Sequence, residues 1–290
     1  MVLSEKEKEV VIRRFSLNNK ERQTLESIGR SFNVTRERVR QIEKIALGKL
    51  KRTVNSTKLR FIHELAEAVL KENGGLLLED VLVENILQAL EKTFDVDHHI
   101  VRLSLTICPN LMSLEKNNLY RLSWHLDTIP SSAIQSALTA ATKALKEKKD
   151  VLSAQDLVQV MNKVPALAAM DLPEEFYISA LSADERIKQV EEGYGLVNWR
   201  HINPKSIRDK ALIVLRREAK PLHFVEIADK IMQSGFDEKH VTVQAVHNEL
   251  IKDSRFVRIG RGIYALAEWG YQAGTVADII AQILQEASTL

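Results

Sequence analysis

Three segments of the sequence share a pattern that recurs about every 70 residues and covers most of the chain. In each, a helical pattern ends in a charged turn and a short apolar run leads into another helix: LKENGGLLLEDVL, LKEKKDVLSAQDLV and LRREAKPLHFVEIA. Each segment closes with a strand-like alternation that starts at Tyr120, Tyr194 or Tyr264, and these tyrosines lie 74 and 70 residues apart. The period exceeds the roughly 20–50 residues of solenoid repeats, so we expect three separate folding units.

The order of elements in one repeat predicts a winged helix, which consists of a helix, a short strand, two helices and a two-stranded hairpin. In the closing strand the tyrosine and the leucine two residues later lie on one face, and the tryptophan that follows is expected to anchor the core. The 290 residues include only 11 glycines and 6 prolines, so loops are scarce and a mainly α fold is favoured. We predict a helix-turn-helix at 1–56, winged-helix-like units at 57–129, 130–203 and 204–271, and a C-terminal helix at 272–290.

Charge divides the chain more sharply than its net value of +2 indicates. Residues 1–60 hold 16 lysines and arginines against 7 aspartates and glutamates, whereas residues 61–204 hold 13 against 21. Residues 205–290 are close to balance, with 12 against 11. A basic segment ahead of an acidic body is typical of a chain whose front end meets a polyanion such as nucleic acid.

Residues 24–42, TLESIGRSFNVTRERVRQI, predict a helix-turn-helix. Asn33 tolerates the left-handed conformation that a tight turn needs, and Thr35 is a favourable N-cap for the helix that follows. Gly29 is expected where the two helices cross most closely. The apolar residues at helical spacing are Leu25, Ile28 and Phe32 in the first helix and Val39, Ile42, Ala46 and Leu50 in the second.

The second helix of this motif carries a polar face that suits DNA. In a helix-turn-helix the second helix lies in the major groove, where arginine bonds guanine, glutamine bonds adenine and glutamate accepts from the cytosine amine. The residues expected to read bases are Arg36, Glu37, Arg40 and Gln41. The residues expected to hold phosphates, which fix register without reading sequence, are Arg30, Thr35, Arg38 and Lys44. The alternative is an ordinary solvated face on a helical hairpin.

The stretch TLESIGRSFNVTRERVRQIEKIALGKLKR closely resembles region four of primary sigma factors of the sigma-70 family, the domain that recognises the −35 promoter element. The resemblance covers about residues 5–53. It implies that the four base-reading residues face DNA and that the domain also grips the flap of the polymerase β subunit. A primary sigma factor has a further upstream region whose exposed aromatics melt the −10 element, and we find no such segment in this sequence. We therefore expect an incomplete sigma factor that does not melt promoters alone.

The third repeat, which ends in RFVRIGRGIYAL, resembles the HARE-HTH winged helix, a family that includes the N-terminal domain of the RNA polymerase delta subunit. Its wing carries Arg255, Arg258 and Arg261, which are expected either to contact a phosphate backbone or to lie on a solvated hairpin. The second repeat has Glu191 and Glu192 in the same place. Like charge near phosphate is unfavourable, so this copy is expected to be a spacer that faces protein.

The remaining features point away from catalysis and membranes. Residues 275–290 predict an amphipathic helix that packs on the third unit or forms a dimer surface. We find no Gly-rich phosphate loop, nucleophile elbow or set of metal ligands, so we expect no enzyme activity, cofactor or metal. No apolar run is long enough to span a bilayer, no signal segment is evident, and the single cysteine, Cys108, forms no internal disulfide. These features favour a cytoplasmic protein.

Together the sequence predicts a DNA-binding transcription regulator, similar to a sigma factor, that recognises a −35-like element, docks on RNA polymerase, or does both. The expected partners are double-stranded DNA and RNA polymerase. Two alternatives stay open. One is a delta-like polymerase-associated protein that binds the β flap without reading DNA, and the other is the recognition subunit of a DNA-processing system of the restriction type.

Overall fold

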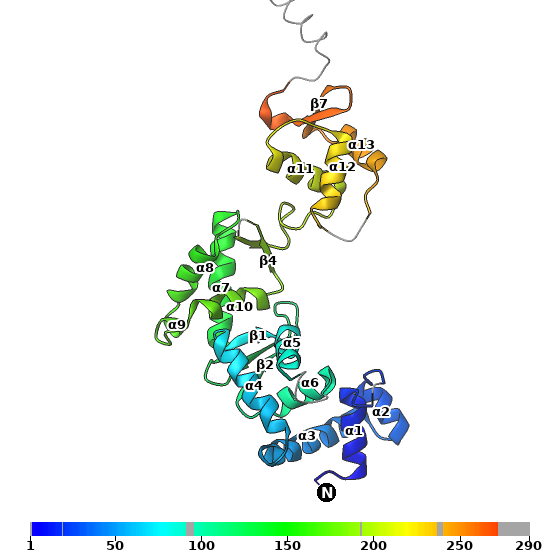
Figure 1. The fold of residues 1–290 in the computed structure, drawn as a ribbon, viewed down its shortest axis with the longest axis vertical. Coiled ribbons are helices and arrows are strands. Elements are labelled where there is room, and N and C mark those ends of the chain that lie inside the picture. Colours follow the sequence, from blue (N-terminus) through cyan, green and yellow to red (C-terminus); the bar gives the residue numbers. More distant parts are fainter. Residues whose placement is uncertain (1, 19, 91–95, 192, 237–239, 272–290) are drawn as a thin grey trace, which may run out of the picture. The chain divides into compact units, whose positions relative to one another are not determined.

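We describe the protein from a computed structural model, in which residues 2–18, 20–90, 96–191, 193–236 and 240–271 are described. The chain divides into two compact units, Met1–Gly195 and Leu196–Leu290. Helices dominate both units, and the strands form only small sheets (Figure 1). The prediction of a mainly α fold is therefore confirmed. In the described part of the chain, no helix has the length and apolar character needed to span a membrane.

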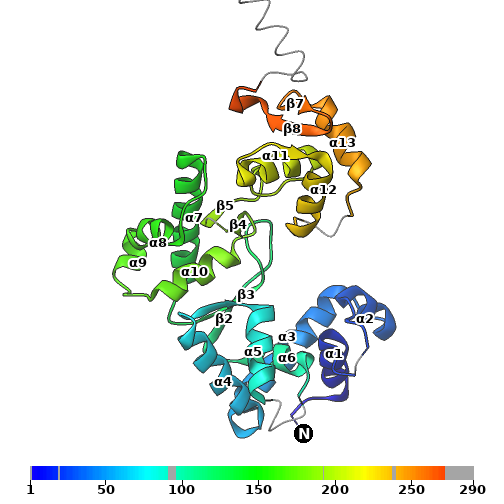
Figure 2. The ribbon, with the colours of Figure 1, turned by 45° about the horizontal axis from the view of Figure 1, so that its top comes forward.

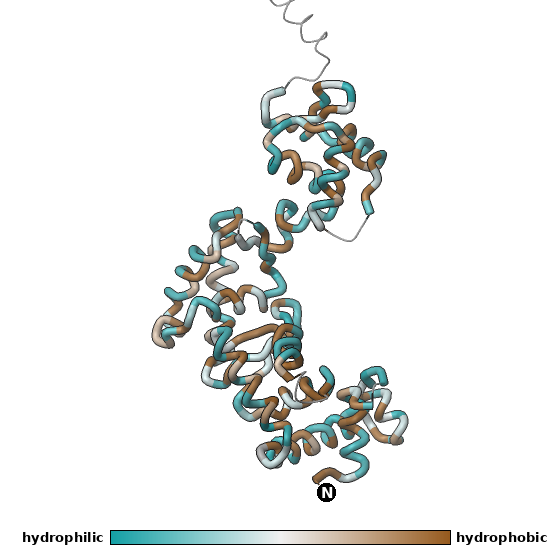
Figure 3. The backbone as a smooth tube through the Cα atoms, viewed as in Figure 1, coloured by the Kyte–Doolittle hydropathy of each residue, from teal (hydrophilic) through white to brown (hydrophobic). Residues whose placement is uncertain are grey.

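The helix-turn-helix lies at the start of the first unit and has its own small core. Val10, Ile28 and Val39, one from each of its three helices, are fully buried against one another. Apolar and polar residues alternate along these helices (Figure 3), so each buries one side. The helices are α1 (Glu5–Phe15), α2 (Leu25–Phe32) and α3 (Arg36–Thr53).

The turn between α2 and α3 has the local structure that the sequence predicted. Asn33 ends α2 in the left-handed conformation, with φ 52°. The Thr35 side chain caps α3 by accepting a hydrogen bond from the N–H of Arg38 at 3.2 Å. Gly29 is buried where the chain turns back, and a Cβ there would lie 2.7 Å from the carbonyl oxygen of Val34. All three predictions for the turn are confirmed.

The first winged copy follows a short 3-10 turn, Val54–Ser56. Its sheet has the strand order β1-β3-β2, with antiparallel pairs that include Leu77 opposite Trp124. Its core lies between the sheet and three helices. The elements are α4 (Leu59–Glu72), β1 (Leu76–Leu78), α5 (Glu79–Leu90), α6 (His98–Ile107), β2 (Leu111–Leu114) and β3 (Ser123–Leu126).

The second copy keeps the same order in a reduced form. Its first strand is a single bridge between Leu152 and Tyr194, and its hairpin pairs two short strands. The elements are α7 (Ser131–Lys148), α8 (Ala154–Asn162), the short α9 (Pro165–Ala168), α10 (Glu174–Ala183), β4 (Ile187–Val190) and β5 (Gly193–Leu196).

The third copy lies in the second unit. Its sheet order, β6-β8-β7, repeats that of the first copy, and Leu222 pairs with Tyr264. Its elements are α11 (Ile207–Glu218), β6 (Leu222–His223), α12 (Phe224–Gln233), α13 (Val243–Lys252), β7 (Phe256–Gly260), β8 (Ile263–Leu266) and the 3-10 turn Ala267–Trp269. The prediction of three winged-helix-like units is confirmed. The predicted C-terminal helix lies outside the described residues, and the exact domain boundaries stay predictions.

The strand pairing corrects one alignment of the repeats. Leu77, Leu152 and Leu222 each stand two residues before the next helix, and they pair with Trp124, Tyr194 and Tyr264. The aligned positions of the closing strand, Trp124, Tyr194 and Tyr264, are therefore 70 residues apart in both steps. The prediction that Tyr120 corresponds to the later tyrosines was wrong, because a longer hairpin loop carries Tyr120 out of the sheet and into a bridge with Asp184.

Within the first unit, each winged copy packs on the module before it through the last helix ahead of its hairpin. Leu103 and Ile107 of α6 join Val11 and Ala46 of the helix-turn-helix in one buried cluster. Figure 2 shows α6 beside α1 and α3. After α10, the second copy meets the hairpin loop of the first, where the N–H of Arg121 donates to the carbonyl of Ala183 at 2.8 Å. The same two copies also meet where Gly74 lies against the backbone of Phe176.

We expect Gly29→Ala to destabilise the helix-turn-helix by about 1–3 kcal/mol, because the new methyl group would press on a backbone oxygen that has no room to move. Gly48→Ala is the matched control. Gly48 lies inside α3 with nothing within 4 Å of a Cβ, so alanine should stabilise the protein by about 0.5–1 kcal/mol. Urea unfolding of both variants measures the difference, and equal effects would contradict the packing described for Gly29.

We expect the first unit to lose stability as the pH falls below about 6.5, the ordinary pKa of histidine. His63 is buried and its Nε2 lies 2.8 Å from the carbonyl oxygen of Ser104. Burial lowers the pKa of His63, and also that of His125, below the ordinary 6.5. The unfolded state then binds more protons, so stability is present above about pH 6.5 and is lost below it.

The thermal midpoint at about pH 7.5 and pH 5.5 measures this loss, set against the ordinary histidine pKa. The His63→Gln variant should lose less between the two values than the wild type, because it removes one of the two buried imidazoles. An equal loss in both proteins would refute the role of His63.

Candidate nucleic-acid interface

The solvent side of α3 carries most of the residues predicted to read bases. Glu37, Arg40, Gln41 and Lys44 are exposed on the side of the helix away from its core, and Arg36 is exposed at its first position. The opposite side of the helix is closed, with Val39 and Ala46 fully buried. The structure therefore brings three of the four predicted base-reading residues, Glu37, Arg40 and Gln41, onto one exposed side of the helix, and Thr35 stands just before its first residue.

Two of these residues form an ion pair on the surface of the helix. The Nη2 of Arg40 lies 2.7 Å from Oε1 of Glu37, and its Nε lies 2.9 Å from Oε2. The hydrogen bond from Arg40 lowers the pKa of Glu37 and the pair raises the pKa of Arg40. Both groups therefore stay charged at neutral pH, and the guanidinium lies beside the carboxylate on the exposed surface of the helix.

A second contact joins two neighbours on the same helix. The Nη1 of Arg38 donates to Oε1 of Gln41 at 3.2 Å. Arg30, on α2, pairs with Glu26 at 2.9 Å, and both side chains of this pair are largely exposed. Arg30 and Arg38, two of the residues predicted to hold phosphates, therefore lie on two different helices.

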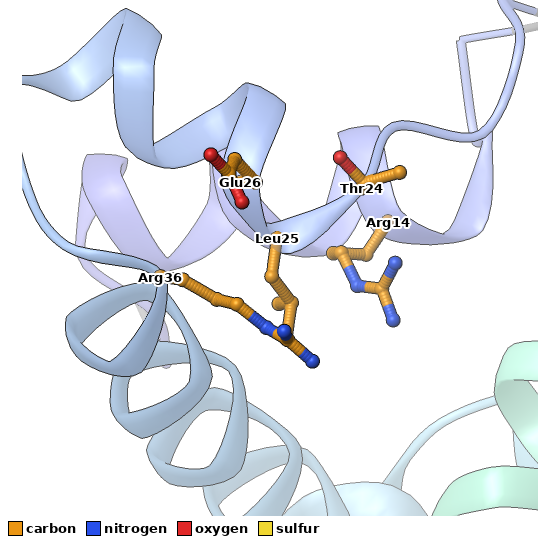
Figure 4. A pocket seen from close by; sticks show the side chains of 5 residues that line it. All are labelled: Arg14, Thr24, Leu25, Glu26 and Arg36. Atoms are coloured by element: carbon orange, nitrogen blue, oxygen red, sulfur yellow. The ribbon is translucent and has the colours of Figure 1, made fainter.

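Arg36 does not lie with the other predicted base-reading residues. Its side chain reaches back toward the start of α2 and shares a hollow of about 440 Å³ with Arg14, Thr24, Leu25 and Glu26 (Figure 4). The first N–H groups of a helix form a site of positive potential. The hollow therefore combines two guanidinium groups with the N-terminal end of α2.

The sequence pattern did not indicate that Arg14 belongs to this hollow. Its Nε lies 3.0 Å from Oε1 of Glu43 on α3, and its Nη1 donates to the carbonyl of Gln23 at 2.9 Å. Its side chain is mostly buried, so this pair fixes α1 against α3. The stretch VVIRRF reads as an ordinary helix, and only the packing of α1 reveals that Arg14 reaches the hollow.

The three arginines in the wing of the third copy lie in two different environments. Arg258 and Arg261 are exposed, and the Nε of Arg258 donates to the carbonyl of Gly260 at 3.1 Å. Arg255 instead pairs with Asp253 at 2.7 Å and lies 3.4 Å from Asp209. The guanidinium of Arg255 is thus paired with carboxylates at the start of the hairpin, while Arg258 and Arg261 lie nearer the tip of the hairpin.

Among the described residues, no group of three histidine, cysteine, aspartate or glutamate side chains is placed to hold a metal ion. Cys108 is buried, and burial raises the pKa of its thiol. A larger hollow of about 580 Å³ lies between the helix-turn-helix and the first winged copy. The charged residues that line it include Arg102 and Glu79, which form an ion pair at 2.9 Å.

Two family models match parts of this chain. Residues 1–52 match the model described as Sigma-70, region 4. Residues 205–269 match the HARE-HTH model, a helix-turn-helix domain whose description includes ASXL and restriction endonuclease. These matches confirm the two resemblances predicted from the sequence. No solved structure matches the chain.

Curated relatives match over 58 residues, about 20% of this chain. The RNA polymerase sigma factor SigA of Clostridium acetobutylicum is 48% identical, and the match covers 15% of that protein. SigA of Listeria monocytogenes and RpoD of Neisseria gonorrhoeae are each 47% identical, with 16% and 9% of their lengths covered. The chain therefore spans less than a sixth of the length of these relatives, and its N-terminal part is similar to sigma-factor region 4.

Proposed function

We propose that this protein is a DNA-binding transcription regulator whose α3 enters the major groove of a promoter element. The single observation that carries the proposal is the exposed polar face of α3. The core and the turn that hold this helix are typical of a helix-turn-helix. The segment is 47–48% identical to sigma factors. The net excess of basic residues in the first 60 positions supports an anionic partner.

We assign base reading to Glu37, Arg40 and Gln41, which lie along the outer face of α3. Arg38 and Lys44 would hold the backbone on the flanks of the same helix. Arg36 fits a phosphate better than a base, because its side chain lies beside Arg14 at the start of α2. This assignment modifies the sequence prediction, which placed Arg36 among the base-reading residues.

The similarity to sigma factors also supports RNA polymerase as a partner, through the flap of its β subunit. A regulator of this kind works in the bacterial cytoplasm on promoters that another factor opens. The second winged copy, which has Glu191 and Glu192 between its two hairpin strands, would face protein rather than DNA.

We expect Arg40→Ala to change which DNA sequences the protein prefers. Loss of a bidentate base contact should reduce affinity for the preferred duplex roughly 5- to 150-fold and relax selection at that position. Arg60→Ala is the matched control, since Arg60 forms a similarly exposed pair with Glu64 on α4. Selection from random duplexes, followed by fluorescence anisotropy, measures both effects. If neither affinity nor preference differs from the control, α3 does not read bases.

We expect Arg36→Ala and Arg38→Ala to weaken binding to all duplexes alike. Each should lower the slope of log affinity against log salt by about 0.9, the contribution of one phosphate contact. A salt titration on preferred and scrambled duplexes checks this. If Arg36→Ala instead relaxed selection at one base pair, the assignment of Arg36 to phosphate would be wrong.

We expect the Arg38→Ala and Arg40→Ala variants to bind core RNA polymerase as the wild type does, because their side chains lie on the DNA face. Co-purification with core polymerase provides the measurement. Normal polymerase binding without salt-sensitive DNA binding by the wild type would instead favour the delta-like alternative. Loss of polymerase binding in both variants would contradict the separation of the two faces.

A further inference from the structure

The hollow of about 580 Å³ lies inside the first unit, and two modules form its walls. The helix-turn-helix contributes residues of α1, of the loop after it and of α3, and the first winged copy contributes residues of α6, β2 and β3. Sites for small molecules measure about 300–1,000 Å³ and often lie where two structural parts meet. The hollow therefore has the size and the position of a small-molecule site.

One part of the wall is apolar. Met112 of β2 lines the hollow and is 51% exposed. Phe15 of α1 and Trp124 of β3 line the same hollow. A methionine side chain is flexible and polarizable, so it packs well against a flat ring. This part of the wall suits an apolar, planar group.

Two basic residues of the wall carry charge that no carboxylate balances. Arg22, in the loop before α2, and Lys51, near the end of α3, are both exposed and line the hollow. In the described part of the chain, neither of them forms an ion pair. Their charges are therefore available to an anionic ligand.

The carboxylates of the wall are already bonded to donors of the protein. Glu43 pairs with Arg14 at 3.0 Å. Glu79 pairs with Arg102 at 2.9 Å. Glu115 accepts a hydrogen bond at 2.7 Å from the hydroxyl of the serine two residues before it. These carboxylates are therefore partly neutralised, and the charges left to meet a ligand are positive.

The cations are spread along the hollow. Lys51 lies eight residues beyond Glu43 on α3, which corresponds to a rise of about 12 Å. Glu43 in turn is the partner of Arg14 on α1. Phosphate oxygens accept strong hydrogen bonds from ammonium and guanidinium groups. Cations spread over this length match a chain of phosphates better than a single phosphate.

Ser16 adds a hydroxyl to the wall. It directly follows α1, lines the hollow and is only 3% exposed. Its backbone is left-handed, with φ 59°, where glycine or asparagine is usual. Among the residues that the structure describes, its hydroxyl has no hydrogen-bond partner. The hydroxyl is therefore free to donate to an acceptor oxygen of a ligand.

We propose that this hollow binds a nucleoside triphosphate. Arg22, Lys51 and Ser16 would bind oxygens of the phosphate chain, and Met112 would pack on the base. The ligand would touch both modules, so it would stabilise the contact between the helix-turn-helix and the first winged copy. The site does not use the outer face of α3 and goes beyond the function proposed above.

Titration calorimetry of the full chain with ATP and with GTP, without added magnesium, tests the proposal. At least one of them should bind with one molecule per chain and raise the thermal midpoint. AMP lacks most of the phosphate chain and inorganic pyrophosphate lacks the base. Each of these two probes should bind at least about tenfold more weakly, because each loses contacts to one part of the wall.

Two variants test the polar contacts. Lys51→Ala should weaken binding of the triphosphate about 10- to 150-fold, the effect of one charged hydrogen bond. Arg52→Ala is the matched control, since Arg52 is the next residue, is exposed and does not line the hollow. Ser16→Ala should weaken binding about fivefold, whereas Ser27→Ala, an exposed serine of α2 outside the hollow, should not.

Met112→Ala tests the apolar part of the wall. It should weaken binding of the triphosphate and leave the affinity for pyrophosphate unchanged, because pyrophosphate has no base. Lys51 and Met112 are exposed, so both variants should fold, and unchanged thermal midpoints without ligand check this.

The proposal is overturned if neither ATP nor GTP binds. It is also overturned if Arg52→Ala weakens binding as much as Lys51→Ala, which would show attraction to surface charge alone, or if pyrophosphate binds as tightly as the triphosphates. None of these results bears on DNA binding by α3, which the duplex measurements described above test separately.

Discussion

The apolar contact between α6 and the helix-turn-helix is the interaction on which the rest of the first unit depends. Leu103 and Ile107 close a groove between α1 and the later turns of α3, where Ala46 is fully buried. Without that cover the groove would expose an apolar surface on the side of α3 opposite its exposed face. Because the same helix also buries Val101 and Leu105 in the winged copy, the helix-turn-helix and the first copy share one structural element and cannot be separated without opening both cores.

The three winged copies share one framework of helices and hairpin. The features that build the framework are kept in sequence: in the second and third copies an aspartate ends the helix and pairs with an arginine two residues later, Asp184 with Arg186 at 2.6 Å and Asp253 with Arg255 at 2.7 Å. The outward residues of the helix differ: at the positions of Leu103 and Ile107 the second copy has Ser179 and Ala183, and the third copy has Asn248 and Lys252. The copies therefore differ at a few outward positions rather than in the fold.

The sequence could predict what is decided locally. Asn33, Thr35 and Gly29 act within a few residues of the turn, and each was identified from residue type and spacing. Tyr120 was wrongly aligned with the later tyrosines because a pattern of apolar residues does not indicate the length of a hairpin loop. The docking of α6 was missed because Leu103 reads as an ordinary core position, and the place of Arg36 because Arg14 comes from a different helix.

The pairing of Glu37 with Arg40 bears on how α3 would distinguish bases. An exposed ion pair contributes little to stability, since water solvates both groups nearly as well when they are apart. A bidentate arginine–guanine contact in a groove is stronger and more directional. DNA can therefore draw Arg40 away from Glu37 at small cost, while the free carboxylate becomes an acceptor for a neighbouring cytosine amine. At guanine or thymine the carboxylate would face only acceptor atoms, so in the proposed complex Glu37 would contribute to selectivity by disfavouring those bases.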